Sequence, residues 1–336
     1  MAKKVTIMDI AKETGYSIAT VSRVLNKKGK YSKEAEEAIT AAAQKRRYLP
    51  DYAAQELRSR SSRMIAVIIP DMEIRYYGLL AQRIQHNLLL KDYYPIYLSL
   101  GTEDLTNDRI FSLLRSMNIC GLVCISCVLD AELLKELSVP TVYVNRIFSG
   151  EEMVHSLRYS SIRPDYRQAG YLAAEELSKK GCKKVGILRG IQKNNFSVRY
   201  QGFIEFVHYF GMEYVETEDV ESVDLMQTGY REAELNYRLH PDLDGLFCDT
   251  DLVATGAMAF YREKGIPIPE KLQLIAYGGL NRDLQFYYRM TSIIIPVDSI
   301  AQETAVMIIE LINGREGDPR EITLQMRLLR GDTTKK

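Results

Sequence analysis

The chain of 336 residues contains no tryptophan and only four histidines, and no apolar run in it approaches the length needed to span a membrane. The histidines are dispersed without metal-ligand spacing, and neither a nucleophile elbow nor a phosphate-binding loop is recognisable. The first residues include two lysines but no uninterrupted apolar segment of the kind found in secretory signals. We therefore expect a cytoplasmic protein with no membrane partner, no cofactor, no metal site and no catalytic residues.

Cysteine is also scarce, and the five cysteines are odd in number and irregular in spacing, which indicates reduced thiols. Three of them, Cys120, Cys124 and Cys127, crowd one apolar stretch. Strict strand alternation places Cys120 and Cys124 on one face and Cys127 on the other, which is a poor start for a metal site. We expect all three to pack in the core.

The net charge of zero conceals an asymmetry along the chain. Residues 1–63 carry 14 Lys+Arg against 7 Asp+Glu, a net of +7, so the remainder carries −7. A small basic head on an acidic body is typical of a nucleic-acid-binding module joined to a second domain.

Residues 6–26, "TIMDIAKETGYSIATVSRVLN", predict two short helices separated by a turn at Gly15. Thr6 and Ser17 are placed to cap the two helices, with Asp9 in the first turn. On the second helix, apolar residues form one face. The side chains on the opposite face are short or polar, apart from one arginine. This face suits either entry into a DNA major groove or exposure to solvent, and its residues are Ala19, Ser22, Arg23 and Asn26.

A third helix is expected after Ser32, with a buried stripe of Ala35, Ala38, Ile39 and Ala42. Its C-terminal end carries the basic residues 45–47, which suit the helix dipole and could also meet phosphates.

The head resembles the helix-turn-helix of the LacI/GalR family of bacterial transcription regulators, although Tyr16 stands where valine is usual. The resemblance implies base contacts by Ile18, Ala19 and Arg23, and backbone contacts by residues near them. Ile18 could instead pack beneath the helix. The resulting DNA-binding set in the head is Thr6, Ser17, Ile18, Ala19, Thr20, Ser22, Arg23 and Asn26.

Residues 49–63 resemble the hinge of the same family, with Ala54 and Leu57 matching and Gln55 replacing an arginine. Alone, such a segment is too short for a stable helix. In the family this helix enters the minor groove and its leucine wedges a base step apart, so the resemblance adds Ala54, Gln55 and Leu57 to the DNA-binding set. Ordinary linker packing of Leu57 is the alternative.

From residue 64, short apolar runs alternate with amphipathic stretches, which predicts βαβ units and parallel sheets. Two such series predict two doubly wound halves with a ligand cleft at the carboxyl ends of the strands. This body resembles the family's effector-binding core, which is similar to type I periplasmic sugar-binding proteins. The segments that match include "PDMEIRYY", "PTVYVNR", "FSVRYQGF" and "FCDTDLVATGAM".

By position, the resemblance implies an effector-binding set of Asp71, Glu73, Tyr76, Asp165, Asn195, Arg199, Asp224, Thr250, Asp251 and Gly278. Arg199 is the strongest candidate, because its planar fork suits hydroxyl, phosphate or carboxylate groups. A structural salt bridge is the alternative for this arginine.

The pocket departs from the family pattern at three places. Thr250 replaces an asparagine, Gly278 and Gly279 replace a pair of acids, and Arg75 replaces a proline. Lost carboxylates remove charge-assisted hydrogen bonds of about 1.5–3 kcal/mol each. Three alternatives follow from these departures. The effector is not an ordinary hexose, or other groups of the chain hold it, or the pocket binds its effector more weakly.

The expected domains are residues 1–48 (helix-turn-helix), 49–63 (hinge) and 64–332 (core), the last split into 64–164 plus 296–325 and 165–292 plus 326–332. The expected function is a ligand-responsive regulator, in the form of a repressor of a carbohydrate-utilisation operon, that binds operator DNA as a homodimer. A solute-binding or sensor protein without DNA function is the alternative, and an enzyme is disfavoured.

Overall fold

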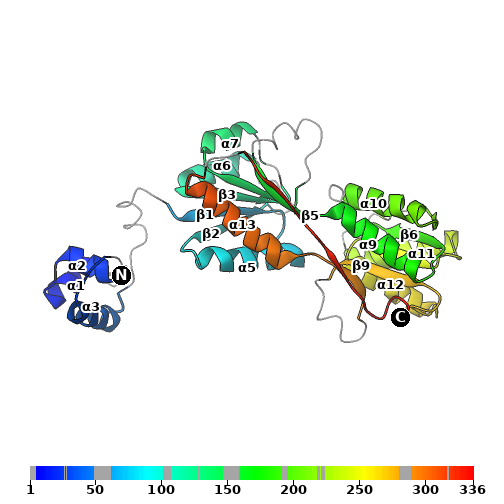
Figure 1. Cartoon of the computed structure of the whole chain (residues 1–336), viewed down its shortest axis with the longest axis horizontal. Coiled ribbons are helices and arrows are strands. Elements are labelled where there is room, and N and C mark those ends of the chain that lie inside the picture. The colour runs from blue at the N-terminus through cyan, green and yellow to red at the C-terminus, as the bar shows by residue number, and fades with distance from the viewer. Residues whose placement is uncertain are drawn as a thin grey trace. The chain divides into compact units, whose positions relative to one another are not determined.

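The computed structural model divides the chain into two compact units, Met1–Ser62 and Arg63–Lys336 (Figure 1). The residues that the structure describes are 5–25, 27, 29–48, 62–100, 107–127, 129, 131–146, 159–190, 196–217, 220, 224–279, 289–315 and 318–336.

The described residues of the first unit form three short helices, namely α1 (Ile7–Thr14), α2 (Ile18–Leu25) and α3 (Lys33–Lys45). A capping box closes the start of α1, because Thr6 and Asp9 each accept a hydrogen bond from the other's backbone N–H. Gly15 ends α1 with a φ of +74°, in the left-handed region. The caps and the turn predicted from the sequence are confirmed.

The core of this unit is made of six buried side chains, drawn from all three helices. The expected burial of Ala38 was wrong, because this residue is exposed. Ala38 lies at the edge of the α3 stripe, and the two short helices packed on α3 cover only the middle of that stripe. The buried residues are Ile10, Val21, Val24, Ala35, Ile39 and Ala42.

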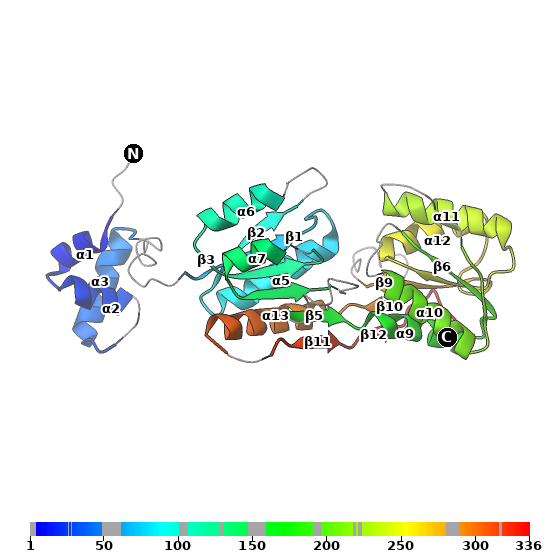
Figure 2. The same ribbon diagram turned by 90° about the horizontal axis from the view of Figure 1, so that it is seen from above.

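The described residues of the second unit form two sheets, and every strand pairing among them in the first sheet is parallel. Helices α5 (Arg75–Leu89) and α13 (Val297–Ile312) pack together on one face, and α6 (Asn107–Ser116) and α7 (Ala131–Leu137) cover the other (Figures 1 and 2). The strands lie in the order β11 (Glu321–Leu324), β5 (Ser160–Pro164), β4 (Thr141–Val144), β3 (Ile119–Ile125), β1 (Met64–Ile69) and β2 (Tyr94–Ser99).

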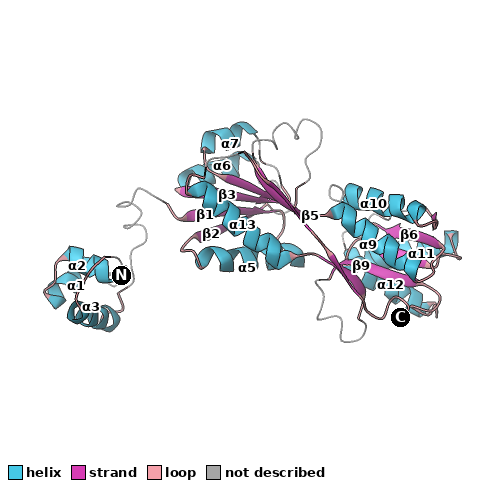
Figure 3. Ribbon diagram, in the orientation of Figure 1, coloured by secondary structure: helices cyan, strands magenta, loops and turns pink. Residues whose placement is uncertain are grey.

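The second sheet is parallel except for its last strand, β12, which runs antiparallel to β10. Helices α9 (Tyr166–Lys179) and α10 (Phe196–Tyr209) pack as a pair, as do α11 (Leu225–Leu239) and α12 (Asp251–Glu263) (Figure 3). The strand order is β12 (Arg327–Leu329), β10 (Thr291–Ile294), β9 (Gln273–Gly278), β8 (Gly245–Cys248), β6 (Lys184–Leu188) and β7 (Glu213–Tyr214). The predicted pair of doubly wound α/β subdomains is confirmed.

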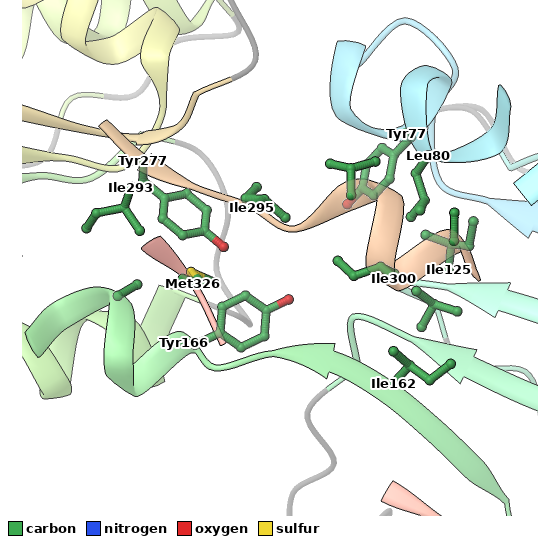
Figure 4. Close-up of a cluster of buried hydrophobic side chains, with 14 of the residues drawn as sticks. Tyr77, Leu80, Ile125, Ile162, Tyr166, Tyr277, Ile293, Ile295, Ile300 and Met326 are labelled. Carbon is green, nitrogen blue, oxygen red and sulfur yellow. The ribbon is translucent and has the colours of Figure 1, made fainter. Parts of the chain in front are cut away.

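The chain passes between the sheets three times: from β5 into α9, from β10 into α13 and from β11 into β12. One hydrophobic cluster continues along these connections. In Figure 4, Ile295 lies on the connection from β10 to α13, between the side chains of Tyr277 of β9 and Tyr77 of α5. The ring of Tyr166, at the start of α9, lies below this connection. The packing of the connections thus links the two subdomains.

A bulge in β3 corrects the expected placement of the cysteines. The β1–β3 register shifts between Met64 and Ile65, so one extra residue of β3 stands opposite this step. A bulge reverses the alternation of side chains beyond it. Cys120 consequently packs against the cluster that contains α5 and α13, whereas Cys124 lies in the cluster beneath α6 and α7. Cys127 joins Cys124 in that cluster because it follows the end of β3 at Ile125, where Ser126 has a φ of +51° and strand alternation no longer applies. The prediction of core packing for these cysteines is confirmed, but the assignment of faces was wrong.

Among the described residues, no helix is long and apolar enough to cross a membrane.

Candidate functional site

The outer face of α2 is the candidate DNA interface. Val21 and Val24 point into the head and are buried, whereas Ile18, Ala19 and Arg23 are exposed. Ile18 is 45% exposed, which is unusual for an isoleucine in a packed helix pair. The position of Ile18, ambiguous from the sequence, is therefore on the accessible side of α2.

The start of α2 is held by two hydroxyl groups. The Ser17 Oγ accepts a hydrogen bond from the Thr20 backbone N–H at 3.1 Å and lies 2.9 Å from the Thr20 Oγ1. This cap fixes the first turn and satisfies one of its N–H donors. The rest of the helix N-terminus, with its positive dipole end, remains suited to a phosphate of a DNA backbone.

Arg23 is exposed, and its guanidinium folds back along the head. Its Nε donates to the Ala19 carbonyl at 3.3 Å, and its Nη1 donates to the Lys30 carbonyl at 3.5 Å. Both bonds are long, so they hold the side chain only weakly. An arginine placed in this way can extend and donate both guanidinium nitrogens to a guanine.

The basic end of α3 has a structural partner as well. The Glu13 carboxylate accepts hydrogen bonds from Arg46 and from Lys45 Nζ, the latter at 3.2 Å. These bonds lower the pKa of Glu13, with the Arg46 bond as the largest cause. Lys45 and Arg46 therefore tie α3 to α1.

Five residues predicted from the resemblance lie outside the described residues, so their roles stay predictions. Four belong to the DNA-binding set and one to the effector set: Asn26, Ala54, Gln55, Leu57 and Asn195.

The candidate effector site lies at the carboxyl ends of the strands in the second unit. Arg199 of α10 is buried there and donates through Nη2 to the Asp249 carboxylate. The Arg199 guanidinium carbon lies 3.8 Å from the centre of the Tyr277 ring. Burial lowers the pKa of Arg199, and the ion pair with Asp249 keeps its charge compensated. The sequence prediction of a cleft-facing arginine did not anticipate this partner.

Tyr76 contributes to the same region from the side of the first sheet. Its hydroxyl accepts a hydrogen bond from the Asn145 side chain, and the Asn145 carbonyl accepts from the Tyr166 hydroxyl at 3.5 Å. Burial is the largest cause of the raised pKa of both tyrosines, and proximity to Tyr277 adds to it. These phenols therefore stay neutral and act only as hydrogen-bonding groups.

Three predicted effector residues cap helices. Asp165 accepts a hydrogen bond from the Gln168 N–H at 2.9 Å, Asp224 from the Gln227 N–H at 2.7 Å and Thr250 from the Val253 N–H at 3.2 Å. Each cap engages one lone pair of its side-chain oxygens, and these oxygens have further acceptor capacity. Capping explains why polar residues stand at these positions, of which Asp165 comes just after β5 and Thr250 just after β8.

The remaining predicted residues lie near the ends of β1 and β9. Asp71 accepts from the Glu73 N–H at 2.8 Å and thereby shapes the turn before α5, while Glu73 is exposed. Asp251 is buried and accepts from the Gly279 N–H at 3.2 Å, which fixes the backbone beside Gly278. Among the described candidates, the structure therefore gives most side chains a local partner.

Sequence reasoning missed Asn145, Asp249 and Tyr277. Each stands at or directly after the carboxyl end of a parallel strand. That position places polar groups at the ligand-binding edge of a doubly wound sheet, and it was the signal available for finding them. The Asp249 Oδ2 is buried and has no hydrogen-bond partner among the described residues, so it can accept a donor from a ligand.

The comparisons with known proteins agree with this architecture. Residues 6–51 match the model of bacterial regulatory proteins of the lacI family, and residues 174–334 match a periplasmic binding protein-like domain. The chain thus carries a head similar to the lacI family of bacterial regulatory proteins and a periplasmic binding protein-like domain. Its two matched segments correspond to the helical head and to much of the second unit.

Several curated relatives match this chain over nearly its whole length. The ribose operon repressor of Halalkalibacterium halodurans is 29% identical over 98% of this chain and 97% of the relative. The HTH-type transcriptional repressor PurR of Pectobacterium carotovorum is 25% identical over 96% and 95% of the respective chains.

Solved structures share the fold. The lac repressor dimer bound to operator and the anti-inducer ONPF aligns with a TM-score of 0.82 and 19% identity, covering 99% of both chains. A LacI family regulator from Enterococcus faecium with bound ribose aligns with a TM-score of 0.69 and 20% identity, covering 81% of this chain and 98% of that one.

Proposed function

We propose that this chain is a transcriptional repressor of the LacI family that binds an operator through α2 and responds to a small molecule bound in its core. One observation carries the proposal: the face of α2 bearing Ile18, Ala19 and Arg23 is exposed on a head that matches the lacI family model. Small side chains there allow close approach to a major groove, and the arginine supplies base readout.

The proposed effector is a carbohydrate or a derivative of one. The H. halodurans relative is named a ribose operon repressor, and fold neighbours were solved with ribose or in complex with cellobiose. The acceptors Asp165, Asp251 and Asp249 lie at the strand ends, where sugar hydroxyls could donate to them. With Arg199 already paired, hydroxyl recognition depends mainly on these acceptors.

Two copies of the chain would grip two half-sites of a near-palindromic operator, so a homodimer is part of the proposal. Effector binding would change the relative pose of the two subdomains and, through the hinge, the affinity for DNA. Induction and co-repression use the same parts with opposite sign. Because its operator is bacterial DNA, we propose that the protein acts in the cytoplasm. We also propose that it has no catalytic role.

The test is selection of operator sequences from a random DNA library with the full chain, followed by affinity measurements at physiological salt. We expect near-palindromic sites that bind at least about a thousandfold more tightly than random DNA. Equal affinity for both would refute the repressor and favour a sensor without DNA function. A thermal-shift screen of sugars, sugar phosphates, nucleosides and amino acids would then identify the effector class, since a ligand that binds the native state raises stability.

A further inference from the structure

The candidate effector site contains a cation that the chain itself neutralises. Asp249 directly follows β8, and its backbone N–H donates to the Leu188 carbonyl at 2.9 Å, so the pairing with β6 fixes its position. From there the Asp249 carboxylate accepts the hydrogen bond from Arg199 Nη2. The side chains of Asp249 and Arg199 are only 1% and 3% exposed, so solvent screens their attraction weakly and each charge compensates the other.

This pair disfavours an anionic ligand beside it. The Tyr277 ring covers one face of the Arg199 guanidinium, with its centre 3.8 Å from the guanidinium carbon. An anion that approached Arg199 would either displace the Asp249 carboxylate or lie next to it. The first leaves a buried carboxylate without its counter-charge, and the second brings two negative charges together where solvent screens them poorly.

Helix N-termini are the other common anion-binding groups of such a site, and here they carry carboxylates of the chain. Asp165 caps α9 and Asp224 caps α11, each by accepting a hydrogen bond from a backbone N–H of the first turn. Thr250 caps α12, whose first residue is Asp251. Each of these three helix starts therefore has its positive dipole end partly neutralised before a ligand arrives.

The same site suits a ligand that donates hydrogen bonds. Among the described residues, no donor reaches the buried Asp249 Oδ2. A buried acceptor without a donor is costly, and a ligand hydroxyl can relieve that cost, whereas a carboxylate or a phosphate dianion has only acceptor oxygens. Burial raises the pKa of Tyr76 and Tyr166, so their phenols stay neutral and can pair with hydroxyl groups as donors or acceptors.

We propose that the effector is an uncharged polyhydroxy molecule, and that Asp249 sets this selectivity by neutralising Arg199. This selectivity rests on the proposed function, because it specifies the ligand class of the same site. Phosphate and carboxylate derivatives of the sugar bind poorly, since the arginine is already paired and carboxylates stand at the helix starts. Hydroxyl groups bind well, since they supply a donor to the acceptors gathered there.

The test is calorimetric titration of the full chain with ribose, glucose, galactose and cellobiose. Each sugar that binds is then competed with its monophosphate ester and, for glucose and galactose, with its uronic acid, at constant ionic strength. Competition reports only on the site that the neutral sugar occupies, so anions bound to the basic head do not contribute. We expect the wild type to bind at least one neutral sugar, and to bind its charged derivatives at least about tenfold more weakly.

Asp249→Asn keeps the size of the side chain and removes its charge, so the charge of Arg199 becomes available to an anion. We expect the preference for the neutral sugar over its charged derivatives to fall at least about tenfold in this variant. Asp242→Asn removes a carboxylate of the same subdomain that is 64% exposed, and this matched control should keep the wild-type preference. Arg199→Met/Asp249→Leu removes both charges and should not gain affinity for the charged derivatives. Thermal unfolding shows whether each variant is folded, and the wild-type preference remains decisive if one is not.

A wild type that binds a charged derivative as tightly as its neutral parent, or that binds no neutral sugar of the panel, would overturn the proposal. A charged group bound so tightly would be held elsewhere, for example by Arg75, Arg83 and Arg327, which line the adjoining pocket of about 530 Å³. An unchanged preference in folded Asp249→Asn, or an equal change in the control, would overturn it too. Operator affinity is measured separately on the same preparations, so its loss would refute the repressor function, whereas a charged effector would refute only the selectivity.

Discussion

Arg199 of α10 and Asp249 at the end of β8 form a buried ion pair, with 3% and 1% of their side chains exposed. Tyr277 stacks on the guanidinium with its ring centre 3.8 Å from the guanidinium carbon. The arginine expected to face a ligand is therefore already neutralised by the chain. A ligand that engaged Arg199 would have to share it with Asp249.

Asp249→Ala is expected to lower the free energy of unfolding by about 3–5 kcal/mol, because it leaves a buried guanidinium without its counter-charge. The double variant Arg199→Met/Asp249→Leu should recover most of this loss, since it removes both charges and keeps much of the volume. Urea unfolding of the variants measures the difference. A double variant as unstable as the single one would contradict a compensated pair.

Arg23→Ala is expected to weaken binding to the selected operator by about 1–3 kcal/mol and to leave binding to random DNA less affected. The exposed position of Arg23 predicts little change in the stability of the head. Gel-shift titrations on both DNAs give the comparison, with Arg262→Ala as a control for loss of one positive charge. A uniform loss on both DNAs would assign Arg23 to phosphate contact.

Leu57→Ala tests the hinge proposed from the resemblance. A leucine that wedges a base step supports the bend of specific DNA, so its truncation should reduce operator affinity much more than affinity for random DNA. The same two titrations measure both. Equal losses would mean that Leu57 serves ordinary packing.

Gly256→Ala is expected to destabilise the second unit by about 1–3 kcal/mol. A Cβ at Gly256 of α12 would lie 1.9 Å from the Met226 carbonyl oxygen of α11, so the helices would have to separate. Gly78→Ala is the control, since its Cβ meets nothing closer than 3.6 Å and alanine favours the helix by about 0.5–1 kcal/mol. Thermal unfolding should move in opposite directions for these two variants.

The buried tyrosines predict a loss of stability in alkali. Burial raises the pKa of Tyr76, Tyr166 and Tyr277 above the ordinary value of 10.0. The contribution of these neutral phenols to the free energy of unfolding is fully present at a pH below the ordinary tyrosine pKa. It is lost as the pH rises above that pKa, because the tyrosines of the unfolded chain ionise first. Tyr166→Phe should make this fall shallower, and Tyr209→Phe, at a residue 77% exposed, should not. Urea unfolding at several alkaline pH values tests the difference.

Much of the architecture could be predicted from neighbouring residues alone. Thr6, Gly15 and Ser32 mark helix boundaries within the head, and the apolar runs beginning at Met64 and Leu274 mark strands. Caps and periodicity act over one or two turns, so the sequence displays them directly. The burial of Ala38 could not be decided in this way, because it depends on how widely two other helices cover α3.

By itself, the sequence determined a helix-turn-helix head followed by two doubly wound α/β subdomains. Tertiary structure alone decided that Arg199 meets Asp249, 50 residues away, and that a bulge turns Cys120 to the opposite face from Cys124. It also gathered Arg75, Arg83 and Arg327 around one pocket. These arrangements arise where segments distant in the chain pack together, and no local propensity encodes which side chains then face one another.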